Sequence, residues 1–171
     1  MTKALLVIDL QNDYFPGGAF PLWNADTVLE RLERAIADAT AQGLPVILIQ
    51  HVAAGGAGLA PFFNEGTAGV ELHPRIRAAA PGAPVVVKRF ADGFHQTTLE
   101  ATLRGLEVTE LLVAGMMTQN CVTHTAISKA AEKYDVTVLA DCCTTVSEML
   151  HLIALNALST RVKLAPSSEM F

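Results

Sequence analysis

Three residues with side chains suited to amide hydrolysis stand just after short apolar segments, far apart in the chain. Asp9 follows LLVI, Lys88 follows PVVV, and Cys121 follows GMMTQN. A carboxylate can accept the proton of a thiol, while a nearby ammonium stabilises the thiolate and holds the carboxylate in place. The three residues could also be ordinary, with Asp9 and Lys88 as an ion pair and Cys121 as a small buried side chain. Which interpretation holds depends on whether the fold brings them together.

The elements that must position these residues alternate along the chain. Short apolar segments predict strands, and between them lie segments of helical period, including 26–42 and about 119–133. The strand segments are continuously apolar, which is typical of strands covered by helices on both faces. This pattern predicts an α/β fold with a three-layer, doubly wound (Rossmann-like) sheet of six parallel strands in the order 3-2-1-4-5-6. The six predicted strands are 4–8, 45–50, 84–88, 109–114, 135–140 and 160–164.

In such a sheet, ligands bind beyond the carboxyl ends of the strands. Strands one and four are neighbours, so Asp9 and Cys121 can meet, and Lys88 can reach them from strand three with its long side chain. Cys121 would lie in the first turn of the helix over about 119–133, where the helix dipole and free N–H groups favour a thiolate. The predicted topology therefore supports a single site at this edge.

Three sequence blocks carry a family resemblance. They are ALLVIDLQNDYF at 4–15, VVVKRFADGFHQTTLEATLR at 85–104 and LLVAGMMTQNCVTHTA at 111–126. They closely resemble the isochorismatase-like cysteine hydrolases, the superfamily that includes nicotinamidases, N-carbamoylsarcosine amidase and streptothricin hydrolase. The resemblance implies that Asp9 is the general base and acid, Lys88 the electrostatic partner and Cys121 the nucleophile. It also implies a cis peptide bond between Met116 and Met117 and an oxyanion hole made by the backbone N–H groups of Met117 and Cys121.

The chain departs from the nicotinamidases of that superfamily at their metal site. Those enzymes carry an Asp-x-His pair after the second strand and a further histidine, whereas this chain reads QHVAAGG. His51 is present without the aspartate, and His73 lies too far along to complete the short spacing. Since a catalytic zinc normally needs three protein ligands, we expect no metal and no other cofactor.

Other histidines and cysteines have simpler interpretations. His124 lies one helical turn after Cys121, but we expect it to pack or face solvent and not to form a Cys–His pair. We expect His95 and His151 to be surface or helix-face residues. Cys142 and Cys143 are interpreted as small buried residues, because adjacent cysteines rarely suit each other as a disulfide.

Aromatic residues in the predicted loops suggest the walls of a substrate pocket. A small apolar pocket is predicted, although Trp23 could equally anchor an interface. The residues assigned to it are Phe15, Trp23, Phe90 and Phe94. Segment 52–74 contains Gly, Ala and Pro in excess with Phe62 and Phe63, and its length predicts a lid or a subunit contact.

Composition limits the possible partners. The 171 residues carry a net charge of -5 with no Lys/Arg block, which argues against nucleic acid, and the apolar segments are too short to span a bilayer. We expect a single domain over 1–171, a cytoplasmic location, a small-molecule substrate, no nucleic-acid or membrane partner, and a homo-oligomer, either dimer or tetramer.

The leading hypothesis is a metal-independent cysteine amidohydrolase that cleaves a small amide-type C–N bond through a thioester on Cys121. Two alternatives remain open. One is an isochorismatase-type vinyl-ether hydrolase, which the resemblance implies would need the aspartate and no cysteine nucleophile. The other is a non-catalytic binding protein on the same fold.

Overall fold

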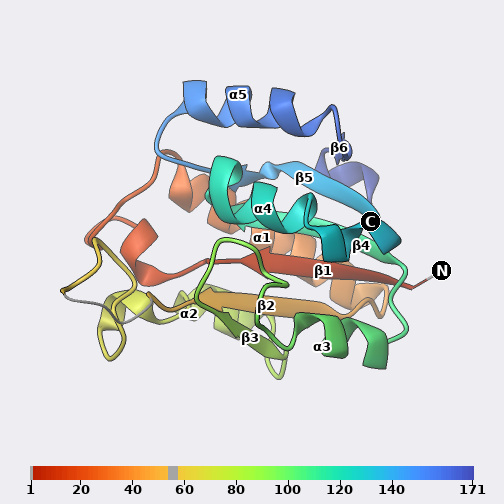
Figure 1. The fold of residues 1–171 in the computed structure, drawn as a ribbon, viewed down its shortest axis with the longest axis horizontal. Helices are drawn as coiled ribbons and strands as arrows, with labels where there is room; N and C mark the ends of the chain where they lie inside the picture. The colour runs from red at the N-terminus through yellow and green to blue at the C-terminus, as the bar shows by residue number, and fades with distance from the viewer. Residues whose placement is uncertain (1, 54–57) are drawn as a thin grey trace.

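The sheet has the topology that the sequence predicts. A computed structural model describes residues 2–53 and 58–171, and its strands are parallel in the order β3-β2-β1-β4-β5-β6 (Figure 1). The predicted α/β fold class and strand order are therefore confirmed. The strands are β1 (Lys3–Ile8), β2 (Val46–His51), β3 (Val85–Lys88), β4 (Glu110–Met116), β5 (Asp135–Thr144) and β6 (Lys163–Ala165).

Helices cover both faces of the sheet and create two apolar cores. On one face, side chains of α1 and α2 join the alternate strand residues Leu5 and Val7. On the other, side chains of α3, α4 and α5 join Leu6 and Ile8. Successive residues of β1 thus enter opposite cores, which is why this strand is continuously apolar. The helices are α1 (Ala25–Ala41), α2 (Pro74–Ala79), α3 (Leu99–Gly105), α4 (Thr123–Ala126) and α5 (Glu148–Leu158).

The prediction of one long helix over about 119–133 is wrong. The chain instead forms a π-helical turn over Thr118–Val122, the short helix α4 and a 3-10 turn over Lys129–Lys133. Hydroxyl side chains explain the interruption, because they offer backbone groups alternatives to helical hydrogen bonds. The Ser128 backbone is extended, with φ -55° and ψ 144°, and its side chain accepts from the N–H of Ala130 to start a new turn.

The described part of segment 52–74 lies against the protein's own body. The Phe62 and Phe63 rings lie 5.3 Å and 4.5 Å from the ring of Tyr14, and Leu72 forms an antiparallel bridge with Gln11. Residues 54–57 of this predicted lid or subunit contact lie outside the described residues. Phe62, Phe63 and Leu72 thus pack against the connection between β1 and α1.

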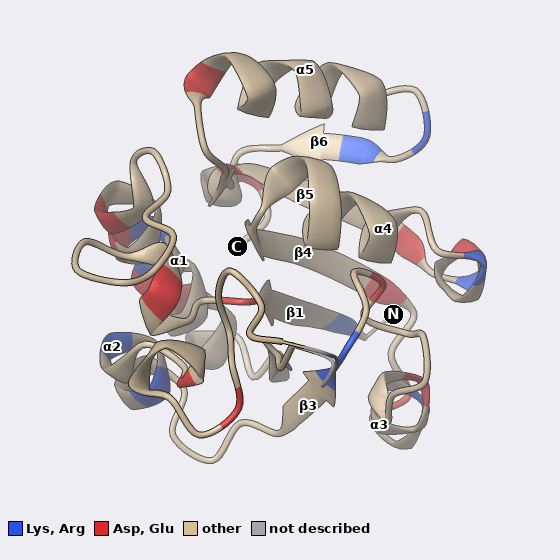
Figure 2. Ribbon diagram, turned by 60° about the vertical axis from the view of Figure 1, so that its left-hand side comes forward, with Lys and Arg blue, Asp and Glu red and all other residues tan. Residues whose placement is uncertain are grey.

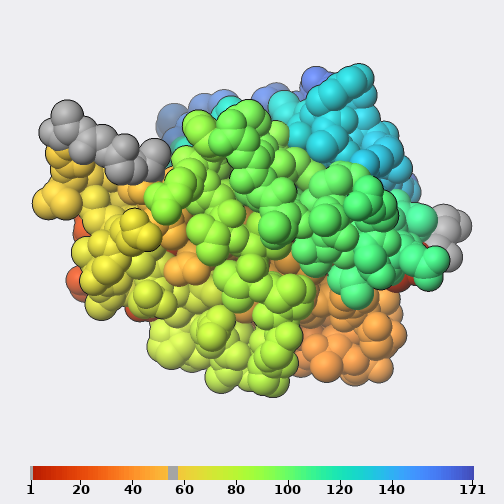
Figure 3. Space-filling model, turned by 60° about the horizontal axis from the view of Figure 1, so that its bottom comes forward, coloured from red at the N-terminus to blue at the C-terminus, as the bar shows by residue number. Residues whose placement is uncertain are grey.

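Charged residues gather on α1, α2 and α3, whereas α5 bears a single charged residue, at its first position (Figure 2). The outward face of α5 exposes the apolar side chains of Met149, Leu152 and Ile153. Figure 3 shows another face, where the segment from β3 to β4, in lime to green, forms a continuous surface. Among the described residues, no helix combines the length and hydrophobicity that a membrane crossing requires.

Candidate active site

Asp9 directly follows β1, at the carboxyl edge of the sheet. Its backbone lies in the left-handed region, with φ 57°, which aspartate tolerates better than most residues. Its N–H still donates to the carbonyl of Ile49 at 2.9 Å. The side chain is fully buried, and within the described residues its Oδ1 atom has no hydrogen-bond partner.

The Lys88 side chain contacts both of the other predicted catalytic residues, Asp9 and Cys121. Its Nζ atom lies 2.9 Å from Oδ2 of Asp9 and 3.2 Å from Sγ of Cys121. The side chains of Lys88 and Asp9 are both 0% exposed, and Cys121 is also buried. The three residues that the sequence places at separate strand ends therefore meet in one buried cluster.

Cys121 owes its position to the π-helical turn and to a close approach of β4 to β1. Gly115 has a φ of 129°, and a Cβ atom there would lie 2.1 Å from the carbonyl oxygen of Ile8. The next peptide bond, between Met116 and Met117, is cis. The N–H of Val122 donates to the carbonyl of Met117 and closes the turn that holds Cys121.

His51 and Gln11 are the site residues that the sequence reasoning missed. Nδ1 of His51 lies 2.8 Å from Nζ of Lys88, and the two residues are register partners on neighbouring strands. The buried Gln11 side chain bonds both backbone groups of His51, accepting from N–H at 2.8 Å and donating to C=O at 2.7 Å. The predicted strand order makes strands two and three neighbours. Because His51 and Lys88 stand at the carboxyl ends of these two strands, that order could have indicated their contact.

Electrostatics make the resting sulfur a thiol. Burial raises the pKa of Cys121, the Asp9 charge raises it further, and Lys88 only partly opposes them. The thiolate expected from a helix start is thus corrected, because Cys121 lies inside a π-helical turn and is desolvated. Burial lowers the pKa of Lys88, but the Asp9 charge and the contact with Cys121 outweigh it and raise that pKa above 10.5. Burial and the Lys88 charge lower the pKa of His51.

The donor set does not fit a metal ion. Asp9, His51 and Cys121 each place one ligand atom within 4.8 Å of the other two. However, all three residues contact Nζ of Lys88, at 2.9, 2.8 and 3.2 Å. A metal ion among them would compete with a buried ammonium for the same ligand atoms, at the cost of leaving that charge unpaired.

The predicted pocket aromatics have separate surroundings. Phe15 is buried with its ring 4.5 Å from that of His73, and Phe94 is buried against Tyr134 at 6.2 Å. Trp23 is partly exposed with its ring 6.1 Å from that of His151, and Phe90 is half-exposed against His95 at 4.7 Å. Of these four, Phe90 touches the cluster, through its carbonyl oxygen 3.2 Å from Nζ of Lys88.

The remaining histidines and cysteines differ in their burial. His124 is exposed, with Nδ1 2.8 Å from the carbonyl of Asn120, and His95 is also exposed. Cys142 and Cys143 are buried, as predicted. His151 is not a surface residue: it is buried on α5, and its Nδ1 lies 2.8 Å from Oγ1 of Thr118 at the start of the π-helical turn.

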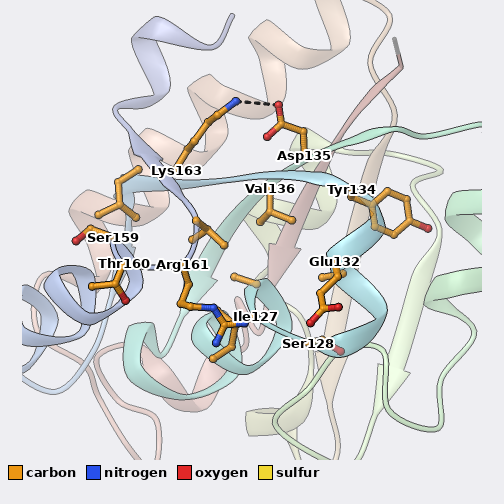
Figure 4. A pocket seen from close by; sticks show the side chains of 14 residues that line it. Ile127, Ser128, Glu132, Tyr134, Asp135, Val136, Ser159, Thr160, Arg161 and Lys163 are labelled. Carbon is orange, nitrogen blue, oxygen red and sulfur yellow. Dashed lines mark hydrogen bonds and ion pairs between the residues drawn. The ribbon is translucent and has the colours of Figure 1, made fainter.

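A well-formed cavity lies away from the cluster. It has a volume of about 790 Å³ and lies between α4, the start of β5 and the connection from α5 to β6 (Figure 4). Among its lining residues, Lys163 pairs with Asp135, and the hydroxyls of Ser159 and Thr160 donate to carbonyls of α5. These polar groups are already satisfied, and the cavity contains none of the predicted site residues.

Comparison with known proteins identifies the family. The isochorismatase domain matches residues 3–168, so the chain belongs to the isochorismatase family and is one of its hydrolases. The resemblance seen in the three sequence blocks is thereby confirmed.

Individual relatives match most of the chain. It is 37% identical over 147 residues to the uncharacterized isochorismatase family protein YddQ of Bacillus subtilis (strain 168), covering 86% of this chain and 80% of YddQ. It is 32% identical over 191 residues to the ureidoacrylate amidohydrolase RutB of Methylobacterium radiotolerans, covering 93% and 74%. The crystal structure of an isochorismatase family protein from Desulfovibrio vulgaris superposes with a TM-score of 0.87 at 27% identity, covering 99% of this chain and 96% of that one.

Proposed function

We propose that this protein is a metal-independent cysteine amidohydrolase acting on a small amide-type C–N bond. The observation that carries the proposal is the buried Lys88 ammonium, 2.9 Å from Oδ2 of Asp9 and 3.2 Å from Sγ of Cys121. The similarity to an amidohydrolase supports the choice of an amide bond. The substrate itself is a small molecule whose identity the loop side chains set.

Asp9 is the proposed general base. Lys88 holds its Oδ2 atom, while Oδ1 is a buried acceptor without a donor among the described residues. Such an atom is suited to receive a proton, since an unmet buried acceptor is costly. As Sγ of Cys121 attacks the carbonyl carbon, its proton passes to Asp9, which later gives it to the departing amine. Water then hydrolyses the thioester and restores the thiol.

The proposed oxyanion hole uses the backbone N–H groups of Met117 and Cys121. Met117 directly precedes the π-helical turn and Cys121 lies within it, so their N–H groups belong to the same small region as the nucleophile. Two fixed donors would stabilise the negative oxygen of each tetrahedral intermediate, and losing one such donor typically costs about 3 kcal/mol of barrier. Of the predicted pocket residues Phe15, Trp23, Phe90 and Phe94, the half-exposed Phe90 is the one proposed to border the substrate, because its carbonyl oxygen lies 3.2 Å from Nζ of Lys88.

The proposal also includes self-association. Met149, Leu152 and Ile153 give α5 an exposed apolar face, and a second copy of the chain is its proposed occupant because Glu148 is the single charged residue on this helix. Analytical ultracentrifugation should show a dimer or tetramer that Leu152→Glu dissociates. A monomeric wild-type protein would rule this part out.

The direct test of the reaction is trapping of the acyl-enzyme. Intact-mass spectrometry during turnover of a panel of small primary amides and ureido compounds should detect an adduct on the wild-type protein. Cys121→Ala should abolish both adduct and turnover, whereas the matched control Cys142→Ala should retain them. Turnover that survives Cys121→Ala would refute the nucleophile, and turnover of a vinyl ether in that variant would favour the aspartate-only reaction.

A further inference from the structure

The Lys88 ammonium has more acceptors around it than hydrogens to give. Its Nζ atom lies 2.8 Å from Nδ1 of His51, 2.9 Å from Oδ2 of Asp9, and 3.2 Å from both the carbonyl of Phe90 and Sγ of Cys121. A protonated lysine carries three N–H groups. The two shortest contacts, to His51 and Asp9, therefore fix its rotation, and the third hydrogen is shared between Phe90 and the sulfur.

The contact with Lys88 also fixes the state of His51. An ammonium donates hydrogen bonds and accepts none, so Nδ1 of His51 must be the acceptor and its ring proton must be on Nε2. A protonated imidazolium at this position would face the ammonium with a like charge. His51 is thus neutral when the Lys88 contact is made.

Gln11 holds the backbone of His51 on the side where the pairing with β1 has ended. The paired register of β1 and β2 ends at Ile8 and Ile49, two residues before His51. Beyond it, Oε1 of Gln11 accepts from the N–H of His51, and its Nε2 donates to the carbonyls of His51 and Val70, both at 2.7 Å. The buried amide side chain replaces the missing strand pairing and fixes the direction of the imidazole.

We propose that His51, held by Gln11, is a positioning residue that orients the Lys88 ammonium so that its third hydrogen points toward the sulfur of Cys121. This inference rests on the proposed role of Cys121 as nucleophile. His51 acts through Lys88 and is assigned no contact with substrate. Its essential atom is the acceptor at the δ position of the ring.

Two substitutions isolate that acceptor. His51→Asn keeps an acceptor oxygen at the δ position, whereas His51→Leu has a similar volume without it. The measurement is the rate of Cys121 alkylation by iodoacetamide across pH, followed by intact mass and peptide mapping, together with thermal unfolding of each variant. The ionisable groups that face the sulfur are Asp9, Lys88 and Tyr14, and all are unchanged in these variants.

We expect His51→Leu to lower the alkylation rate at fixed pH by about tenfold or more, the usual weight of a hydrogen bond to a charged group, and to move its alkaline midpoint upward. His51→Asn should match the wild type in both. Gln11→Met should lower the rate as well, and adding it to His51→Leu should lower it no further, because both act through one contact.

Several results would overturn the inference. Equal profiles for His51→Leu and the wild type would remove the role of His51, and equal losses in His51→Asn and His51→Leu would remove the role of the acceptor. Additive losses with Gln11→Met would remove the link to Gln11. In contrast, a wild-type protein in which Cys121 is never alkylated would overturn the proposed function as well.

Discussion

Replacing Lys88 by methionine tests whether the cluster contains a real buried ion pair. Methionine has nearly the length and shape of the lysine stem, so the loss of packing is small. The main effect is electrostatic: the buried Asp9 carboxylate loses the ammonium that lies 2.9 Å away in the wild type, where both side chains are 0% exposed. Removing one partner of a buried pair costs about 3–5 kcal/mol, a large part of the roughly 5–15 kcal/mol that stabilises a typical domain. Urea denaturation at pH 7 measures this loss directly.

The matched control is Lys163→Met. Lys163 also pairs with an aspartate, Asp135, at 2.8 Å, but the two side chains are 68% and 54% exposed. Water and salt screen such a pair, so its denaturation midpoint should equal that of the wild type. The reasoning would be refuted if the two variants lost the same stability, because the Lys88–Asp9 contact would then behave like a surface pair.

Three further predictions concern neighbouring parts of the site. Gly115→Ala should lower the free energy of unfolding by about 3 kcal/mol or more in the same denaturation assay, because its Cβ would lie 2.1 Å from a backbone oxygen. The control Gly105→Ala has open space around the new Cβ and should be neutral or stabilising. Iodoacetamide labelling of Cys121 should rise only in the alkaline range, since burial raises the pKa of its thiol; fast labelling below pH 7 would contradict this. Burial and Lys88 lower the pKa of His51 below 6.5, so its contribution to stability is complete above pH 6.5 and is lost as the pH falls. His51→Asn should therefore lose less stability than the wild type between pH 7 and pH 5, and a control His124→Asn, at an exposed position, should behave as the wild type.

The predictable part of the fold comes from hydrophobic pattern and topology. The central strands β1 and β4 are buried on both faces along most of their length, so their apolar segments could be found in the sequence, and the doubly wound order then placed Asp9, Lys88 and Cys121 at one edge. The outer strands were predicted less well: β5 continues to Thr144 beyond the predicted 135–140, and β6 covers Lys163–Ala165 and not 160–164. Predicting the site required only the residues that follow three strands. Their convergence is a consequence of parallel strands, whose carboxyl ends point the same way.

What escaped prediction depends on side chains competing for backbone groups. The helix after β4 is interrupted because Thr123 donates to the carbonyl of Thr118 and Ser128 starts a new turn. Helical periodicity carries no information about such local competition. For the same reason the role of Gln11 was not predicted: its side-chain amide makes hydrogen bonds to the backbone of His51 beyond the point where β1 and β2 pair. In the sequence, His51 resembles part of an incomplete metal site, and its spacing alone says nothing about a lysine on the next strand.

Lys88 links the chemistry of the site to the stability of the sheet. Its ammonium contacts groups from the ends of β1 and β2 and from the turn after β4, while its own backbone ends β3. These four strands are neighbours in the sheet, so one buried charge ties together the edge at which the reaction is proposed. A substitution that disturbs the ammonium must therefore lower stability and reactivity together, whereas one that alters only the sulfur should lower reactivity alone. The ratio of the two effects thus separates residues that hold Lys88 from those that react.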